Sequence, residues 1–342
     1  MKKIIQRIVI LTSSGSNLIK LCLLLLLYSI TNVAYAATCA ATTTSGGTLS
    51  YGSASSISIQ TAQRATSTSN AGLQCGGALL SLLGQQYVRA TINTTNKGLL
   101  KNSQGDSIPY QIYADANYQN EIVPGTTFYY LTPSLIDLLG LFGGNTKNIP
   151  MYFRTQTGTY NLRADTYTDT ISVTWQWYFC SISITPLICI NPTSGATTWT
   201  AVLSLTVTND CIINAPDINF GSKPLATLFP SVSQSVSVYC TKGSTYSIGL
   251  NNGSNALGQQ RRLAFNGNFL NYEIYQGNSG TLRWGTLAAE RRSSANADVN
   301  PGSGSGVSSS TQGFVYRAMI LPNQTTPPAG TYTDTIIIDV AF

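Results

Sequence analysis

The side chains that enzymes use for acid–base, nucleophilic or metal chemistry are scarce in this chain. Its 342 residues include no histidine and only 13 acidic residues. The G-x-S-x-G, H-E-x-x-H and P-loop patterns are absent from the sequence. Asp106, Asp115, Glu121 and Asp137 could supply a pair of carboxylates, but acidic residues scattered in this way are usually solvated loop residues. The sequence therefore indicates a protein that is not an enzyme and needs no cofactor and no metal ion.

The first 36 residues have the pattern of a secretory signal peptide. Four basic residues precede an apolar run at 21–27, and Ala34-Tyr35-Ala36 then provides a small-x-small cleavage motif. The apolar run is too short to cross a bilayer as a helix. Removing this segment leaves residues 37–342 with 15 basic residues (19 − 4) and 13 acidic ones, a net charge of +2. So small a charge argues against a nucleic-acid partner.

Cysteine is the remaining residue type whose side chain could react or bind a metal ion. Six cysteines follow the signal peptide, at positions Cys39, Cys75, Cys180, Cys189, Cys211 and Cys240. An even number of cysteines in an exported chain predicts disulfides that form in an oxidising compartment. A zinc site would need histidines or closely spaced cysteine pairs, and the sequence has neither.

An internal repeat divides the chain into two related halves. The sequence DTYTDTI at 165–171 recurs as GTYTDTI at 330–336, and Cys75 and Cys240 have the same separation of 165 positions. We therefore expect an N-terminal domain at 37–180, a linker at 181–200 and a C-terminal domain at 201–342. The equivalent positions predict the disulfides Cys39–Cys75 and Cys211–Cys240, which leaves Cys180 to pair with Cys189.

The apolar residues alternate with polar ones, as in strands that bury one face. Ile171, Val173, Trp175 and Trp177 alternate with Ser172, Thr174 and Gln176, and stretches rich in Gly, Asn, Ser and Pro separate such runs. The pattern predicts an all-β fold with two β-sandwiches.

The C-terminal half resembles the spore coat protein U domain family. The residues that carry the resemblance are NDCI at 209–212, NFG at 219–221, VSVYCTKG at 236–243, WG at 284–285 and PAGTYTDT at 328–335. The N-terminal half resembles this family only at the repeated positions. The two-domain arrangement is similar to that of the tip adhesins of Csu-type pili, the archaic branch of the chaperone–usher pathway.

This resemblance implies two immunoglobulin-like sandwiches, the C-terminal one lacking its last strand. A periplasmic chaperone, and then the next pilin subunit, would supply a donor strand to the open sheet edge, and an outer-membrane usher would export the subunit. The groove is expected to be lined by Leu203, Leu205, Val207, Ile336, Ile338, Val340 and Phe342. The alternative is a complete sandwich that ends on its own last strand.

Only Ala37 and Thr38 precede Cys39 after the expected cleavage site, which is too short for a donor strand. We therefore expect the protein at the tip of a pilus, on the surface of a Gram-negative bacterium. Two apolar insertions in the N-terminal half could bind hydrophobic surfaces there. Their residues are Leu79, Leu80, Leu82 and Leu83 in the first, and Leu135, Ile136, Leu138, Leu139, Leu141 and Phe142 in the second.

Three alternatives to exposed adhesive loops remain open at this point. The helical spacing of Leu135, Leu138, Leu139 and Phe142 is also compatible with a short helix that caps the sandwich. A glycan-binding adhesin could stack sugars on its aromatic residues, with candidates at Tyr129, Tyr130, Trp175 and Trp177. The protein could also be a purely structural pilus or coat subunit. Leu99 and Leu100 form a weaker, third candidate loop.

Overall fold

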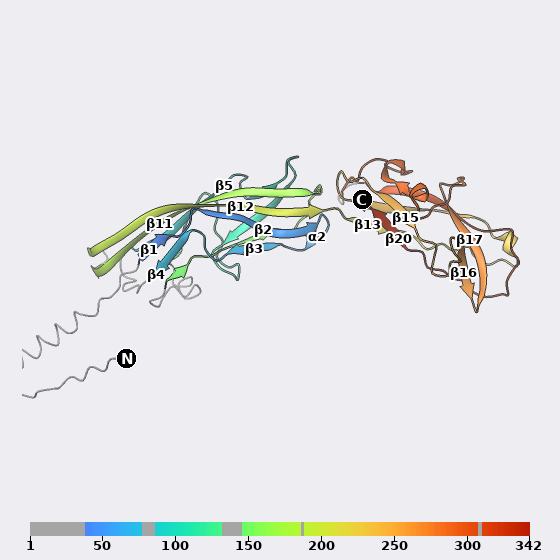
Figure 1. Ribbon diagram of the computed structural model, residues 1–342, viewed down its shortest axis with the longest axis horizontal. Helices are drawn as coiled ribbons and strands as arrows, with labels where there is room; N and C mark the ends of the chain where they lie inside the picture. The colour runs from blue at the N-terminus through green and yellow to red at the C-terminus, as the bar shows by residue number, and fades with distance from the viewer. Residues whose placement is uncertain (1–37, 77–85, 132–145, 186–187, 307–309) are drawn as a thin grey trace, which may run out of the picture.

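The computed structural model describes residues 38–76, 86–131, 146–185, 188–306 and 310–342. It shows two all-β domains placed end to end in an elongated molecule (Figure 1). Each domain has its own hydrophobic core, built from residues 39–207 in the first and 226–320 in the second. The all-β fold class is therefore confirmed. None of the helices in these ranges has the length and apolar character needed to cross a bilayer.

The N-terminal domain contains twelve strands and one short helix among its described residues. They are β1 (Thr38–Ala41), β2 (Ser45–Ser55), α2 (Ser58–Thr61), β3 (Ala65–Thr68), β4 (Leu73–Gly76), β5 (Tyr87–Thr94), β6 (Leu99–Lys101), β7 (Ser107–Tyr113), β8 (Thr127–Tyr129), β9 (Lys147–Asn148), β10 (Met151–Thr155), β11 (Asp165–Thr185) and β12 (Ile188–Thr208). A large sheet has the order β2-β12-β11-β6-β7-β10-β3, with β5 also paired to β11 and β8 paired to β5, and a small sheet has the order β1-β4-β9.

A long hairpin of β11 and β12 dominates this domain. The two strands pair antiparallel from Asp165↔Val207 to Thr185↔Ile188. The inward residues Ile171, Val173 and Trp175 are fully buried, as the alternating pattern predicts. In Figure 1 the far end of the hairpin projects beyond the rest of the domain.

The linker expected at residues 181–200 is wrong, because most of this segment belongs to β12 and pairs with β11. The apolar side chains that follow it, up to Val207, pack in the N-terminal core. The first domain therefore continues to Thr208, and the second begins with β13. The period-2 pattern identified this segment as a strand but did not show which sheet the strand joins.

The C-terminal domain is a sandwich of a five-stranded and a three-stranded sheet. Its strands are β13 (Cys211–Asn214), β14 (Val232–Cys240), β15 (Ser247–Leu250), β16 (Arg261–Phe265), β17 (Asn268–Gln276), β18 (Arg292–Ser293), β19 (Gln312–Ile320) and β20 (Ile338–Ala341), with 3-10 turns η1 (Ala226–Leu228), η2 (Ala288–Glu290) and η3 (Ser294–Asn296). The sheet orders are β13-β14-β19-β17-β16 and β18-β15-β20. Trp284 and Phe314 are fully buried between the sheets.

The three disulfides of the structure join the cysteine pairs that the repeat predicts. Cys39–Cys75 links β1 to β4, and Cys211–Cys240 links β13 to β14, in both cases between directly opposed residues. Cys180–Cys189 bridges β11 and β12 near the far end of the hairpin, with a sequence separation of 9. The first and third bonds therefore occupy equivalent places in the two domains.

Polar side chains connect the two domains where they meet. The buried hydroxyl oxygens of Ser56 and Thr241 are 2.7 Å apart. The Lys242 ammonium group donates to the Asp106 carboxylate at 2.6 Å, and Arg163 pairs with the same carboxylate at 3.0 Å. Because Asp106 and Arg163 belong to the first domain and Lys242 to the second, this carboxylate joins the domains.

Candidate functional site

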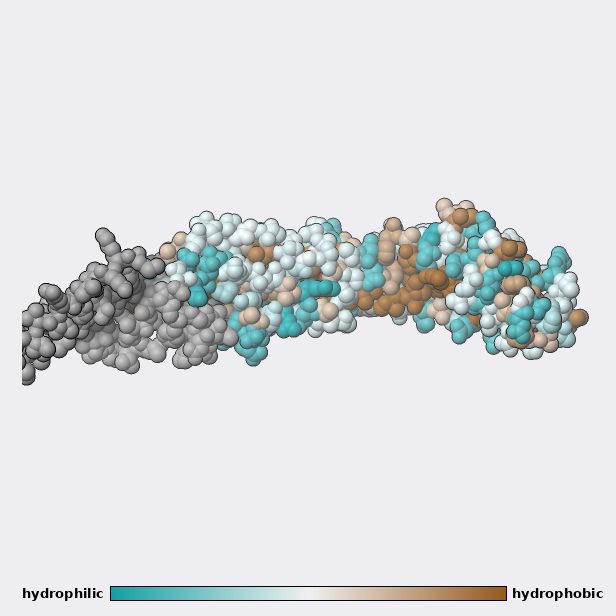
Figure 2. All heavy atoms as spheres, turned by 60° about the horizontal axis from the view of Figure 1, so that its bottom comes forward, coloured by the Kyte–Doolittle hydropathy of each residue, from teal (hydrophilic) through white to brown (hydrophobic). Residues whose placement is uncertain are grey.

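An open groove runs along the C-terminal domain between two chain segments that are not hydrogen-bonded to each other. Residues 215–222 line one side of the groove, and residues 330–336 line the other, over a volume of about 720 Å³. Its floor is apolar and includes Leu250, Leu263, Leu270 and Ile274. Figure 2 shows hydrophobic residues gathered on the half of the molecule that carries this domain.

The strand β20 leaves one edge unpaired beside this groove. It pairs only with β15, at the end of the order β18-β15-β20. Ile336 and Ile338 line the groove, and these side chains and Val340 are half-buried against the core. Phe342 is 56% exposed and its ring centroid lies 6.5 Å from that of Tyr246. An unpaired edge beside apolar side chains is a template for another strand.

The N-terminal domain shows what occupies the equivalent groove. Its β11 carries the first copy of the repeated motif, as residues 330–336 carry the second. There β12 lies between β11 and β2, antiparallel to the former and parallel to the latter. Alternate side chains of β12 fill the core and are buried, namely Trp199, Ala201, Leu203, Leu205 and Val207. No described strand takes this position in the C-terminal domain, where β20 is an edge strand.

Three of the residues expected in the donor-strand groove are therefore placed elsewhere. Leu203, Leu205 and Val207 do not line the C-terminal groove, because β12 buries them in the core of the N-terminal domain. Their sequence pattern is that of a strand with one buried face, which fits either domain equally well. The other four, from Ile336 to Phe342, lie on the chain segment beside the groove or at its end.

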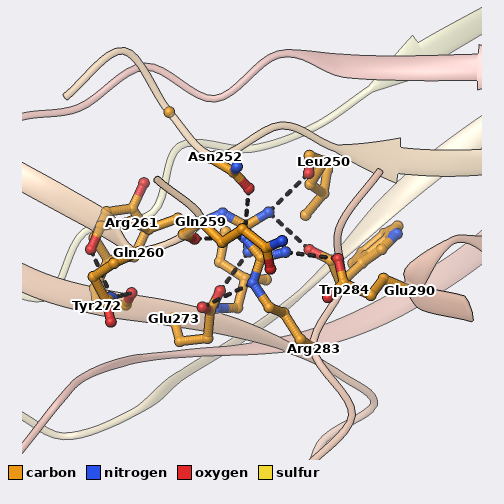
Figure 3. A network of polar contacts seen from close by, with 12 residues as sticks. Leu250, Asn252, Gln259, Gln260, Arg261, Tyr272, Glu273, Arg283, Trp284 and Glu290 are labelled. Carbon is orange, nitrogen blue, oxygen red and sulfur yellow. Dashed lines mark hydrogen bonds and ion pairs between the residues drawn. The ribbon is translucent and has the colours of Figure 1, made fainter. Parts of the chain in front are cut away.

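A buried arginine supports the floor of the groove (Figure 3). The Arg261 side chain is fully buried, and its Nη2 donates to the carbonyl oxygens of Leu250 at 2.8 Å and Trp284 at 2.7 Å. Its Nη1 pairs with Glu273, whose second carboxylate oxygen pairs with Arg283 at 2.9 Å. A buried charge needs such partners, because an unpaired one would lose its hydration without compensation. The network fixes Leu250, which lines the groove.

The two apolar insertions of the N-terminal half, with all ten of their named residues, lie outside the described residues. The residues that flank them are close together at one end of the domain. A Cβ atom on Gly76 would lie 3.0 Å from the backbone of Thr146. The residue that precedes the first insertion therefore lies next to a residue that follows the second. Tyr87, which follows the first insertion, pairs with Tyr178 on β11, and the Cys180–Cys189 hairpin continues beyond this pair. The sequence did not lead us to predict this hairpin as part of a binding site, although the short separation of nine residues between its two cysteines indicates a hairpin closed by a disulfide.

Most other candidate residues have structural roles. Leu100 is fully buried in β6, so Leu99 and Leu100 do not form an exposed loop. Tyr130, Trp175 and Trp177 are buried in the core and are not available to sugars, and the Trp175 indole donates to the Ala71 carbonyl oxygen at 2.7 Å. Tyr129, by contrast, is 48% exposed.

The acidic candidates do not converge on a common site. Asp106 joins the two domains, and the Glu121 carboxylate accepts a hydrogen bond from Gln111 at 3.0 Å. Asp115 is buried and accepts backbone hydrogen bonds within its own loop. Burial raises the pKa of its carboxyl group, but the hydrogen bonds that it accepts, above all those from Asn120, outweigh the effect of burial, and the pKa is lowered. Asp137 lies outside the described residues. In the described ranges no group of three potential ligand residues could hold a metal ion.

The Spore Coat Protein U domain family matches the chain twice, at residues 26–174 and 197–339. The N-terminal half thus matches the family as a whole domain, and not only at the repeated positions. Of the curated proteins, none matches this chain.

Among solved structures, the chain is similar to one in the chaperone–tip adhesion subunit pre-assembly complex CsuC–CsuE of the archaic chaperone–usher Csu pili of Acinetobacter baumannii. The identity is 28% and the TM-score 0.61, covering 89% of this chain and 100% of that one. Two other likenesses are distant and carry no argument. They are the CupB6 tip adhesin of Pseudomonas aeruginosa (11% identity, TM-score 0.26, 82% and 86% covered) and the CfaE adhesin of enterotoxigenic E. coli (11%, 0.31, 88% and 93%). From the two family matches, which span most of its length, the chain belongs to the Spore Coat Protein U domain family.

Proposed function

We propose that this chain is the tip adhesin of a chaperone–usher pilus, exported through the periplasm to the surface of a Gram-negative bacterium. Its C-terminal domain accepts a donor strand in the open groove. Its N-terminal domain binds hydrophobic surfaces through the two apolar insertions. The similarity to a chain of a chaperone–tip adhesion subunit complex supports this assignment.

The contrast between the two grooves carries the proposal. In the N-terminal domain β12 supplies a strand from the same chain, and five of its alternate side chains complete the core. In the C-terminal domain the equivalent space is an apolar groove of about 720 Å³ beside an edge strand. A strand with alternating apolar residues would satisfy the free backbone groups of β20 and cover the groove floor at the same time.

This arrangement supports three partners for the C-terminal domain. A periplasmic chaperone covers the groove before assembly, because an exposed apolar edge would otherwise promote aggregation. The outer-membrane usher then receives the subunit, and the next pilin subunit provides the strand that replaces the chaperone. The first domain needs no partner of this kind, since β12 already occupies its groove.

Adhesion is assigned to the N-terminal insertions from their composition and their flanking residues. Each buried Leu or Phe side chain contributes roughly 1.5–3 kcal/mol, so the ten named residues provide ample attraction for an apolar surface. Loop ordering and lost freedom of motion offset part of that attraction, and many pili acting together compensate for the loss. The close approach of Gly76 and Thr146 brings the ends of both insertions to one end of the domain.

A self-complementation experiment tests the donor-strand groove. A copy of residues 197–208 is appended after Phe342 through a short flexible linker, and the full chain is produced in the periplasm without a chaperone. The appended strand should raise the yield of soluble protein and the unfolding temperature of the C-terminal domain, because its apolar face covers the groove.

The control carries the same extension with the copies of Trp199, Leu203 and Leu205 replaced by serine. This extension retains the backbone donors and acceptors but loses the apolar face. If both extensions stabilise the domain equally, or if neither does, the groove is not a strand acceptor. Immunogold labelling of assembled pili separates a tip adhesin from a structural shaft subunit, since only the former labels fibre ends alone.

A further inference from the structure

The outer face of the large N-terminal sheet carries a cluster of side chains that the proposed function does not use. Strand pairing places Tyr87 opposite Tyr178 and Arg89 opposite Gln176, and β8 brings Tyr129 to the other side of Arg89. These five residues alternate with buried ones such as Val88 and Trp177, so they lie on the face directed away from the core. We call them the Arg89 platform.

The arginine at the centre of this platform is held from several sides. Its guanidinium carbon lies 4.5 Å from the ring centroid of Tyr87 and 6.0 Å from that of Tyr129. Its Nε donates to the Gln176 side-chain oxygen at 2.9 Å, and its Nη1 donates to the Tyr129 hydroxyl at 3.3 Å. The rings of Tyr87 and Tyr178 stack with an angle of 23° between their planes. The side chain is therefore ordered before any ligand binds, which reduces the entropy lost on binding.

This arginine has no acidic partner among the described residues, since none of the ion pairs found there includes it. The neighbouring outward positions on β5, β11 and β8 are threonines, namely Thr91, Thr174 and Thr127. Arg154 provides a contrast on β10. It lies 4.7 Å over the ring of Tyr118, but it pairs across the strands with Gln111, which donates to Glu121. Arg317 also lies over a tyrosine ring without taking part in an ion pair in the described ranges, 5.4 Å from the centroid of Tyr275. Among the described residues, however, Arg89 alone lies within 6.0 Å of two tyrosine rings.

We propose that the Arg89 platform binds a carboxylated saccharide, such as a chain of uronic acid residues. An arginine guanidinium group forms a two-pronged pair with a carboxylate, which accounts for the charged group of the ligand. Tyrosine offers an apolar ring face and a hydroxyl in one side chain, which suits the mixed surface of a sugar ring. Gln176 and the threonine hydroxyls provide further donors and acceptors for sugar hydroxyls.

The location of the platform supports a role in attachment. The strand β5 begins at Tyr87, shortly after the insertion at 77–84, and β8 ends at Tyr129, shortly before the insertion at 131–144. The platform therefore lies beside the points where both apolar insertions leave the sheet. The same end of the protein would bind apolar surfaces through the insertions and acidic polysaccharides through Arg89.

Polygalacturonate and its fully methyl-esterified form provide a matched pair of probes, because they differ only at the carboxyl group, which is a charged carboxylate in the first and an uncharged methyl ester in the second. Binding of the full chain, isolated from the periplasm, is measured against both. We expect binding to the acid form, weakened by salt, and much weaker binding to the ester. Arg89→Gln should reduce the affinity for the acid form about tenfold or more. Arg154→Gln removes the same charge from another tyrosine cluster of the same domain and should leave binding unchanged.

A second variant, Tyr129→Ala, addresses the case in which Arg89→Gln fails to fold, because Tyr129 is an exposed side chain at the edge of the platform. It should also weaken binding to polygalacturonate. Neither variant should reduce attachment to polystyrene, because that attachment depends on the insertions. The polystyrene assay therefore separates this proposal from the proposed adhesin function. The proposal is overturned if the protein binds the acid and the ester equally, or if it binds none of the probes. It is also overturned if Arg89→Gln and Arg154→Gln lose the same affinity for polygalacturonate, or if poly-glutamate binds as well as polygalacturonate.

Discussion

In the C-terminal domain the hydroxyl group of Tyr272 donates a hydrogen bond of 2.7 Å to the carboxylate of Asp334. The N-terminal domain contains the same contact between Tyr110 and Asp169, at 2.9 Å. Both aspartates come from the repeated motif, at positions 165 residues apart. The motif thus has the same structural role in each domain, where it ties β11 to β7 in the first and the segment 330–336 beside the groove to β17 in the second.

We predict that Tyr110→Phe destabilises the protein more than Tyr272→Phe. Asp169 is 2% exposed, and burial raises its pKa although the Tyr110 hydrogen bond acts in the opposite direction. Removing that bond leaves a buried carboxylate short of a partner, at a cost of about 1–3 kcal/mol. Asp334 is only half-buried, so water can replace the lost donor. Urea denaturation of both variants measures the difference, and a larger loss in Tyr272→Phe would contradict this account.

The contact between the domains should weaken in acid. Burial raises the pKa of Asp106, but the hydrogen bonds from Lys242 and Arg163 outweigh this effect and lower it below its usual value. A lowered pKa stabilises the folded state above the pKa of the unfolded chain, and this contribution is lost as the pH falls through the folded pKa. We therefore expect the domains to separate at pH values below about 4, measured as an increase in radius of gyration by X-ray scattering.

The matched variant for this prediction is Asp106→Asn, which removes the charge at all pH values. Its radius of gyration should already be larger at neutral pH and should change less on acidification. If acidification expands Asp106→Asn as much as the unmodified protein, another group controls the contact.

Replacing Arg261 should unfold the C-terminal domain selectively. Arg261→Met leaves Glu273 with one cation instead of two and removes the donors to the carbonyl oxygens of Leu250, Asn251 and Trp284. Breaking a buried pair in this way costs about 3–5 kcal/mol. Calorimetry should show the transition of the C-terminal domain at a lower temperature and that of the N-terminal domain unchanged. A uniform shift of both transitions would mean that the two domains unfold as one unit.

Substitutions in the apolar insertions should separate adhesion from folding. Replacing Leu79, Leu80, Leu82 and Leu83 together with serine should leave the amount of assembled pili unchanged and abolish attachment to polystyrene. The same outcome is expected for Leu138, Leu139, Leu141 and Phe142. Exposed apolar residues contribute little to stability, whereas an apolar surface binds through them. Blots of surface pili and attachment assays measure the two quantities.

Leu73→Ser and Leu100→Ser provide the comparison for that experiment, because both leucines are fully buried. A hydroxyl in place of a core leucine should cost several kcal/mol and eliminate the pili themselves. Loss of pili in the insertion variants as well would mean that these leucines belong to the core. The helix-cap alternative for residues 135–142 would then be the better one.

The local patterns of the sequence determined most of the secondary structure and the covalent links. Alternation at period 2 predicted the buried face of β11, where Ile171, Val173 and Trp175 are fully buried. The internal repeat predicted the cysteine pairs, because equivalent positions in related domains have equivalent neighbours. Both signals are contained in the chain itself: side chains alternate along any strand, and the offset between repeats is visible without a structure.

Only the tertiary structure decided which sheet each strand joins. Leu205 has the same alternating neighbours in either domain, and its place in the N-terminal core depends on the pairing of β12 with β11 and β2. Arg89 is likewise an isolated cation in the sequence, and it becomes part of a platform because β5 pairs with β11 and β8, which are distant along the chain. Hydrogen bonds between strands connect residues far apart in sequence, and the backbone groups that form them are the same in every residue. The sequence therefore specifies which face of a strand is buried. The assembled fold decides which neighbouring strand covers that face, or whether a groove remains because no neighbour is present.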